Sequence, residues 1–221
     1  MGRRWQMAKK ESTFKNMVLT LFLVTLFASS ALALIYEVTK GPIAEAKRLK
    51  KAKAIGEVVP AFDNDPGTEV KKLAVDGDTL YFYRAWTDGK VTGIAVESYT
   101  YAGFSGLIKV IVGFLPDGTL NDIAVLEHAE TPGLGDKMEK GKSFDKSTGE
   151  SWTTQFKGKD PRNYSLRVKQ DNGDVDAITA ATITSRAFCD AVKRAYDGLL
   201  VVTDELDIDA ISGSTQRPNP E

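Results

Sequence analysis

Two stretches of sequence decide the fold of this chain: DTLYFYRAWTDGKVTGIAVESY, residues 78–99, and GLIKVIVGFLPDGTLNDIAVLEH, residues 106–128. In each stretch, runs rich in β-branched and aromatic residues stand on both sides of an Asp-Gly pair, at Asp88-Gly89 and at Asp117-Gly118. Asp-Gly between two such runs is the strongest short-range signal for a β-hairpin, because both residues accept the positive φ of a tight turn. The pattern therefore predicts two antiparallel hairpins.

The segments around the hairpins are predicted to be loops and one helix. FDNDPG, residues 62–67, is a loop, and the stretch 130–162, rich in Gly, Lys, Ser and Asp, is long enough to favour a ligand-facing loop. Residues 185–200 repeat apolar side chains at the spacing of one buried helical face. That face consists of Phe188, Val192, Ala195 and Leu199. These elements indicate one α+β domain over residues 61–205, followed by a tail, 206–221, that is expected to be disordered.

An uncharged run of twenty residues, MVLTLFLVTLFASSALALIY, extends from Met17 to Tyr36. As a helix rising about 1.5 Å per residue, it would cover the roughly 30 Å hydrocarbon layer of a membrane. The alternative is a cleavable signal peptide, since basic residues precede the run and Ala31-Leu32-Ala33 has the A-x-A form of a cleavage site. Apolar residues 34–36 continue the run past that site and favour a retained transmembrane helix over residues 17–36.

Basic residues flank both ends of this run. Five lie before it, in a short tail of residues 1–16, and six follow it at the start of the domain. A large domain translocates largely regardless of its charge, whereas charges on a short tail favour the cytoplasm. The tail is therefore predicted to be cytoplasmic and the domain extracytoplasmic. Gly41-Pro42 is expected to end the membrane helix, and residues 42–60, rich in Ala, Lys and Glu, are expected to form a separate linker helix.

Composition excludes several classes of protein. The chain has 221 residues with 29 basic and 30 acidic side chains, so it lacks the basic excess of a nucleic-acid-binding protein. Cys189 is the only cysteine and His128 the only histidine. This count excludes an intramolecular disulfide and leaves too few ligands for a Cys-rich zinc or iron–sulfur site. No metal site is expected, and redox chemistry would need an organic cofactor or a partner protein.

Four hydroxyl side chains gather before the predicted C-terminal helix, at Thr179, Thr182, Thr184 and Ser185. The simplest interpretation is a helix N-cap, in which a Ser or Thr oxygen accepts a hydrogen bond from a free N–H of the first turn. The alternative uses the same physics, because free N–H groups and the positive end of the helix dipole attract an anionic phosphate. One of these side chains would then be the attachment point of the phosphate.

DAITAAT, from Asp176 to Thr182, resembles the flavinylation signal Asp-x-x-Ser/Thr-Gly-Ala-Thr of a known family. The family is the FMN-binding domain shared by the G subunit of Rnf-type complexes and the C subunit of Na⁺-translocating NADH:quinone reductases. There, a Mg²⁺-dependent flavin transferase uses FAD to esterify the last Thr to the FMN phosphate. The resemblance places FMN on Thr182 and implies that the transferase recognises Asp176, Thr179, Ala181 and Thr182. Ala180 replaces the family's Gly, and a positive φ there would make Ala unfavourable by roughly 1 kcal/mol.

A second signature, HAETPGLG from His128 to Gly135, is similar to the loop that approaches the flavin ring in the same family. Taken alone, TPGLG is an ordinary turn. The two signatures stand about fifty residues apart in the family's order, which makes the resemblance specific. The resemblance implies that Glu130 and Thr131 seat or tune the flavin ring without determining its attachment. A third segment, YAGFSGLI from residue 101 to 108, is similar to the family's Gly-Tyr-x-Gly motif, with Phe104 either walling the ring or packing in the core.

The resemblance implies an electron carrier without catalytic residues of its own, because the flavin performs the chemistry and the protein tunes it. It implies a single-pass subunit of the bacterial inner membrane with covalent FMN. The implied partners are the flavin transferase and the other membrane subunits of the complex, among them a second covalent-flavin subunit. The implied cofactor contacts are Phe104, Glu130, Thr131, Leu134, Gly135, Thr179, Ala181, Thr182, Thr184 and Ser185.

Three alternatives stay open at this point. The compact chain favours the G subunit of an Rnf-type complex over the C subunit of the quinone reductase. A secreted binding or structural module would lose residues 1–33 and carry no flavin, so a covalent flavin would exclude it. An isolated extracytoplasmic flavoprotein reductase or sensor would keep the flavin but lack the membrane partners, which genome neighbourhood would distinguish.

We predict that residues 17–36 remain on the mature protein as a membrane anchor, because the apolar run extends past the A-x-A site. Amino-terminal sequencing of the protein isolated from its native membrane measures this directly. A mature protein that begins at Leu34 would exclude the anchor.

Overall fold

The structure, a computed structural model, describes residues 13–68, 70–144 and 149–203. Residues 1–12 of the expected cytoplasmic tail and the expected disordered tail, 206–221, lie outside the described residues, so both expectations stay predictions. The chain divides into two compact units, of which the first ends at Arg48 and the second begins at Leu49. The second unit contains the sheet, the loops and the C-terminal helix.

The first element, α1, is one helix from Phe14 to Val58. Its most apolar 18-residue window has a mean hydropathy of 2.4, and none of that window is buried within the protein. The helix is therefore long and apolar enough to cross a membrane. The expected break at Gly41-Pro42 and the separate linker helix over 42–60 are wrong, since Pro42 lies inside α1. Proline removes one backbone hydrogen bond, but the strong helix formers of residues 44–54, rich in Ala, Lys and Glu, let the helix continue past it.

Five strands form one antiparallel sheet in the order β1-β2-β3-β4-β5. They are β1 (Val70–Val75), β2 (Asp78–Thr87), β3 (Lys90–Gly103), β4 (Gly106–Phe114) and β5 (Leu120–His128). Both predicted hairpins are confirmed, as β2 pairs with β3 across Asp88-Gly89 and β4 pairs with β5 across Asp117-Gly118. The sequence patterns missed β1, although Asp76-Gly77 has positive φ at both residues and carries the same turn signal.

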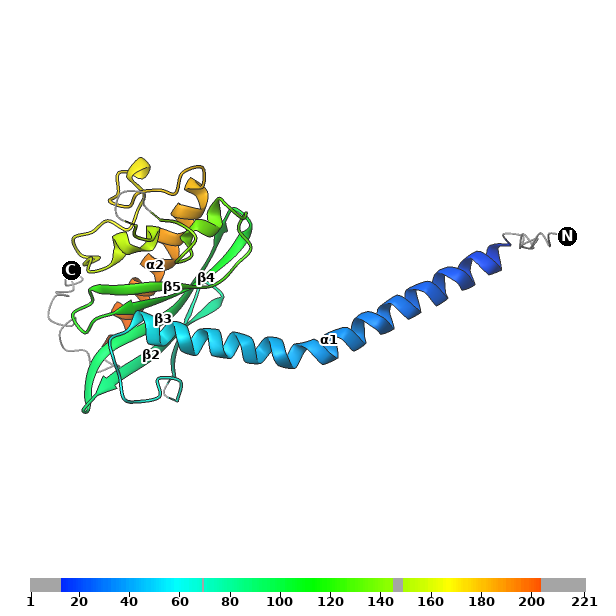
Figure 1. The fold of residues 1–221 in the computed structure, drawn as a ribbon, viewed down its shortest axis with the longest axis horizontal. Helices are drawn as coiled ribbons and strands as arrows, with labels where there is room; N and C mark the ends of the chain where they lie inside the picture. The colour runs from blue at the N-terminus through cyan, green and yellow to red at the C-terminus, as the bar shows by residue number, and fades with distance from the viewer. Residues whose placement is uncertain (1–12, 69, 145–148, 204–221) are drawn as a thin grey trace, which may run out of the picture. The chain divides into compact units, whose positions relative to one another are not determined.

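The sheet is buried on both faces, because side chains alternate between two cores along each strand. Phe82 of β2 and Val112 of β4 belong to the larger core, which also contains helix α2. Their neighbours Tyr83 and Ile111 belong to the smaller core, which contains the end of α1. Figure 1 shows α2, in orange, crossing one face of the sheet.

Helix α2 extends from Thr182 to Val202. It begins three residues before the predicted range of 185–200, so Thr182 and Thr184 belong to its first turn and not to the preceding loop. The predicted buried face is confirmed, since Phe188, Val192, Ala195 and Leu199 are fully buried. Polar contacts add to this packing, as the Ser98 hydroxyl of β3 donates to the Ala191 carbonyl at 2.8 Å.

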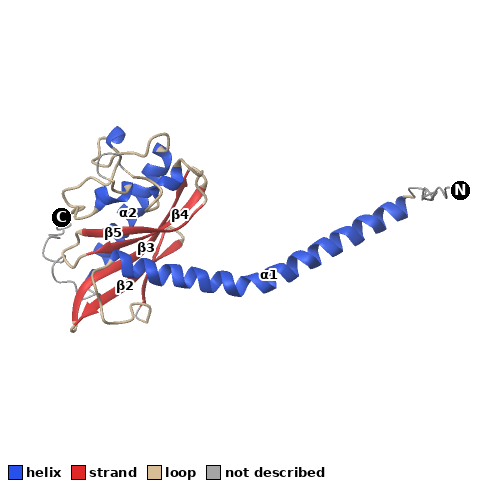
Figure 2. Cartoon of the chain, viewed as in Figure 1, coloured by secondary structure: helices blue, strands red, loops and turns tan. Residues whose placement is uncertain are grey.

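The connection from β5 to α2 is rich in loops, as predicted for residues 130–162. Figure 2 shows this segment as tan loops with short helices between them. The short helices are η1 (Gly135–Met138), η2 (Trp152–Phe156) and η3 (Lys169–Asp171). Met138 and Phe156 from these helices are fully buried in the larger core. The long connection is therefore anchored by apolar side chains, although it has little regular structure.

The end of α1 packs on the smaller core through Ala54, Ile55 and Val58. Gly113 of β4 makes this approach possible, because a Cβ at that position would lie 1.8 Å from the Val58 carbonyl oxygen. The Asn121 side chain donates to the same carbonyl at 2.7 Å. The close contact of helix and sheet thus depends on a glycine and on one satisfied carbonyl at the helix end.

Glu97, a buried carboxylate of β3, also joins α1 to the sheet. It accepts a hydrogen bond from the Tyr83 hydroxyl at 3.0 Å and pairs with Lys51 Nζ of α1 at 2.8 Å. Burial and then the neighbouring Glu97 charge hold the pKa of Tyr83 well above its usual value, so the tyrosine stays a neutral donor. A cation from the helix thus compensates a carboxylate buried under it.

Gly113→Ala is expected to lower the free energy of unfolding by roughly 1–3 kcal/mol, because the added methyl group meets backbone atoms that cannot rotate away. Gly56→Ala is the matched control in the packed end of α1. No atom lies within 4 Å of a Cβ there, and alanine favours a helix by about 1 kcal/mol over glycine. Chemical denaturation of both variants measures the difference, and equal stabilities would contradict the packing of α1 on β4.

Candidate functional site

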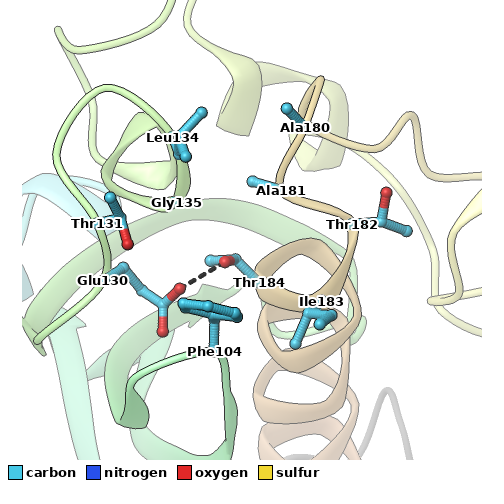
Figure 3. Close-up of a pocket in the computed structure, with 10 residues that line it drawn as sticks. All are labelled: Phe104, Glu130, Thr131, Leu134, Gly135, Ala180, Ala181, Thr182, Ile183 and Thr184. Atoms are coloured by element: carbon cyan, nitrogen blue, oxygen red, sulfur yellow. Dashed lines mark hydrogen bonds between the residues drawn. The ribbon is translucent and has the colours of Figure 1, made fainter.

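A hollow of about 350 Å³ opens between the loop that follows β5 and the start of α2. Its lining residues are Phe104, Glu130, Thr131, Leu134, Gly135, Ala180, Ala181, Thr182, Ile183 and Thr184. Figure 3 shows the loop residues on one side of the hollow, the residues around the helix start on the other, and Phe104 below them. Three segments that are far apart in the sequence therefore build one site.

The loop wall depends on two glycines. Gly133 has a φ of +76°, which L side chains rarely adopt. Gly135 packs so closely that a Cβ would lie 2.6 Å from Glu130 Oε2 and 2.7 Å from the Thr184 hydroxyl oxygen. The Pro-Gly-Leu-Gly part of the motif thus fixes a tight backbone path, which leaves Thr131 and Leu134 at the hollow.

The opposite wall is the start of α2. Ala180 precedes the helix with a φ of +62°, the left-handed conformation that favours glycine. Ala181 is the N-cap residue, and no side chain forms a cap hydrogen bond there. The prediction that a Ser or Thr hydroxyl of this cluster caps the helix is therefore wrong, because the N-cap residue is an alanine. The first-turn N–H groups stand without a side-chain cap at the positive end of the helix dipole.

Glu130 joins both walls to the turn between β3 and β4. Its carboxylate accepts hydrogen bonds from the Thr184 hydroxyl at 2.5 Å and from the Ser105 N–H at 2.9 Å, although the residue is only 5% exposed. Hydrogen-bonding both oxygens is what makes a buried carboxylate tolerable. Glu130 thus lines the hollow, but its oxygens already hold protein donors.

His128 supports this arrangement from outside the hollow. Its Nδ1 accepts a hydrogen bond from the Glu130 N–H at 3.1 Å, so the neutral ring carries its proton on Nε2 and donates to Glu139 at 2.9 Å. Burial opposes the ionisation of Glu139, but its hydrogen bonds with Lys142 and His128 outweigh burial and lower the pKa of Glu139. The histidine of the sequence motif therefore orients the main chain of Glu130.

The structure brings eight of the ten expected cofactor contacts to the hollow: Phe104, Glu130, Thr131, Leu134, Gly135, Ala181, Thr182 and Thr184. Thr179 does not line it and lies exposed in the turn before α2. Ser185 is fully buried, where its hydroxyl donates to the Ala181 carbonyl at 3.0 Å and accepts from the Ile178 N–H at 2.9 Å. Asp176, expected to be recognised by the transferase, also lies outside the hollow.

Sequence reasoning did not place Ala180 or Ile183 at the site. Ile183 is 49% exposed, and Phe104 at 68% and Leu134 at 39% join it in an apolar rim. Ile183 was recognisable in principle, because it is a large apolar residue away from the buried face of an amphipathic helix. Ala180 gave no such signal, since alanine carries no chemistry of its own.

Residues 103–197 match the family model described as FMN-binding domain, and every residue that lines the hollow lies within this range. Fold and site together define an FMN-binding domain that follows an N-terminal apolar helix.

Similar proteins cover more of the chain. One from Cereibacter sphaeroides is 36% identical over 182 residues, 80% of each chain. One from Shewanella amazonensis is 36% identical over 180 residues, 76% of this chain and 80% of its own. One from Vibrio cholerae is 32% identical over 179 residues, 77% and 82% of the two chains. Each is named as the G subunit of an ion-translocating oxidoreductase complex, and the chain belongs to this family, which confirms the resemblance drawn from the two signatures.

The residues at the hollow fit a flavin. The volume of the hollow lies within the roughly 300–1,000 Å³ that is typical of small-molecule sites. Apolar side chains predominate in its lining, with a few polar groups among them. The uncapped start of α2 suits an anionic phosphate, while the apolar rim suits an aromatic ring system. Among the described residues that line the hollow there is no lysine or arginine.

Ala180→Gly is expected to raise the free energy of unfolding by about 0.5–1 kcal/mol, because glycine adopts a φ of +62° without strain from a Cβ. Ala177→Gly, three residues earlier in the signal region and without a positive φ, is the control and should lower stability by a similar amount. Thermal and chemical denaturation measure both changes. A loss of stability in the Ala180 variant would mean that its left-handed conformation carries no strain.

Proposed function

We propose that this chain carries electrons within an ion-translocating oxidoreductase complex through FMN esterified to Thr182. The observation that supports this attachment site is a difference among the four hydroxyls. Thr182 lines the hollow, is partly exposed, and has no side-chain hydrogen bond within the described part of the chain. Thr184 is only 2% exposed and bonds to Glu130. Thr179 lies away from the hollow, and the Ser185 hydroxyl is buried and bonded on both sides.

The attachment is a phosphoryl transfer to the Thr182 hydroxyl. A bond forms between Thr182 Oγ1 and the phosphorus on the flavin side of FAD, the pyrophosphate bond breaks, AMP leaves, and the threonine proton passes to solvent. A Mg²⁺-dependent flavin transferase provides this step during maturation. The resulting phosphodiester keeps one negative charge next to the uncapped first turn of α2, which favours it by about 0.3–1 kcal/mol at an exposed site.

The electrostatics of the hollow favour a covalent link over simple binding. The described lining residues include no lysine or arginine to pair with the double negative charge of free FMN, and the buried carboxylate of Glu130 opposes it. A phosphodiester removes part of that charge. The tether also makes rebinding intramolecular, so a flavin in a partly open site is not lost by dilution.

The residues of the hollow would hold the flavin, which when bound supplies the reversible acceptance of electrons. Phe104, Leu134 and Ile183 offer apolar surface for the ring, and Thr131 offers a hydroxyl for its polar edge. Glu130 acts mainly by holding the two walls together, because its oxygens bond to Thr184 and Ser105. The exposed rim leaves the site accessible to a redox partner.

The proposal includes a location and partners. The apolar part of α1 crosses the inner membrane, and the domain stands on the periplasmic side, since a large domain translocates largely regardless of its charge and the basic residues before α1 favour the cytoplasm. The relatives named as G subunits of an ion-translocating complex support the other membrane subunits of such a complex as partners. An exposed flavin on this side would exchange electrons with a second covalent flavin in those subunits.

Thr182→Ala is expected to give a folded protein without covalent flavin after co-expression with a flavin transferase. Intact mass should fall by the mass of FMN less water, and fluorescence that survives denaturing electrophoresis should disappear. Stability should change by no more than about 1 kcal/mol, because the Thr182 hydroxyl caps no helical N–H.

Two further variants sharpen this test. Thr184→Ala should keep the flavin but lose stability, since it leaves the buried Glu130 carboxylate with one donor fewer. Thr182→Ser keeps the hydroxyl, so loss of flavin there would show transferase selectivity for the threonine methyl group. Retention of the full flavin mass in Thr182→Ala together with its loss in Thr184→Ala would move the attachment site to Thr184.

A further inference from the structure

Two side chains from η2 hold the main chain of Asp176, the first residue of the flavinylation signal. Trp152 Nε1 donates to the Asp176 carbonyl at 2.6 Å. Gln155 bonds to both main-chain groups: its Oε1 accepts from the Asp176 N–H at 2.8 Å, and its Nε2 donates to the Asp176 carbonyl at 3.3 Å. The Asp176 carboxylate points elsewhere and pairs with Lys169 at 2.8 Å while 68% exposed.

This contact is anchored in the core of the domain. The Trp152 ring packs edge-on against Phe156 at 5.5 Å and against Phe188 at 5.1 Å between ring centroids. Phe156 and Phe188 are fully buried, and Phe188 belongs to α2, the helix that begins with Thr182. The pair of Trp152 and Gln155 is therefore fixed relative to the helix that presents Thr182.

The other end of the same loop is also fixed. The Ser185 hydroxyl accepts from the Ile178 N–H at 2.9 Å and donates to the Ala181 carbonyl at 3.0 Å. Between Ile178 and Ala181, which Ser185 holds, the turn at Thr179-Ala180 is exposed to solvent. The segment that enters Thr182 is thus held at its beginning and at its end, with Ala180 in the left-handed conformation between them.

We propose that Trp152 and Gln155 are positioning residues for the attachment of flavin to Thr182. This inference rests on the proposed function. By holding the Asp176 main chain, the two side chains keep the loop in the form that the transferase must bind, while the Asp176 carboxylate stays exposed to the enzyme. Without them, only a fraction of the molecules would present the loop correctly, and the apparent affinity of the transferase would fall in proportion to that fraction.

The test measures flavin transfer to the full-length chain in detergent, with purified transferase, FAD and Mg²⁺, at varied concentrations of the chain. Gln155→Met removes both hydrogen bonds to Asp176, together with the bond that Gln155 Nε2 donates to the Trp152 carbonyl at 3.0 Å, with little change in volume. Trp152→Phe removes the N–H donor but keeps an aromatic ring in contact with Phe156 and Phe188. For the double variant we expect KM for the chain to rise about tenfold and kcat to stay within about twofold. Gln170→Met is the matched control, since Gln170 is exposed on η3, and it should leave KM unchanged.

Hydrogen exchange separates positioning from general destabilisation. In the variants, exchange should accelerate in peptides covering residues 174–184 and not in peptides covering the β4–β5 hairpin. Unchanged KM in the double variant, or equal acceleration in both regions, would overturn the inference. Absence of flavin on Thr182 in the chain without substitutions would instead overturn the proposed function, so the two failures are distinguishable. Trp152→Phe alone repeats the test if the double variant does not fold.

Discussion

The carboxylate of Glu130 accepts hydrogen bonds from the Thr184 hydroxyl and the Ser105 N–H, and three chain segments meet on this one side chain. The residue is almost fully buried, and in the described part of the chain no cation pairs with it. A buried charge of this kind is stable only while its hydrogen-bond donors stay in place. These hydrogen bonds hold together the β3–β4 turn, the loop after β5 and the first turn of α2. The hollow forms between these three segments.

A second constraint comes from two glycines at positions where a Cβ atom would clash with its neighbours. Gly135 lets the loop approach the Glu130–Thr184 pair, and Gly113 lets the end of α1 lie on β4. Backbone atoms of Val58 crowd Gly113, and the hydrogen-bonded side chains of Glu130 and Thr184 crowd Gly135, so both glycines act through the space they leave. The sheet can therefore bind α1 on one face and α2 on the other, while the flavin hollow forms where α2 begins.

At the start of α2, two residues depart from the usual conformational preferences of their residue type and position. Ala181 provides no side-chain cap, and Ala180 adopts a φ that favours glycine. Such departures are expected where function competes with stability, because an uncapped helix start is the feature that attracts a phosphate. Packing elsewhere compensates for them, since Phe188, Val192 and Leu199 on one face of the same helix are fully buried.

The sequence by itself determined the two Asp-Gly hairpins, the buried face of α2, the apolar span and the family, because each depends on a local pattern or on a short motif. It also identified most residues of the hollow through the two signatures. Only the tertiary structure decided that the end of α1 packs on the sheet, that α2 starts at Thr182, and that Thr184 bonds to Glu130. Those outcomes depend on packing and hydrogen bonds between segments far apart in sequence, and local patterns do not contain that information.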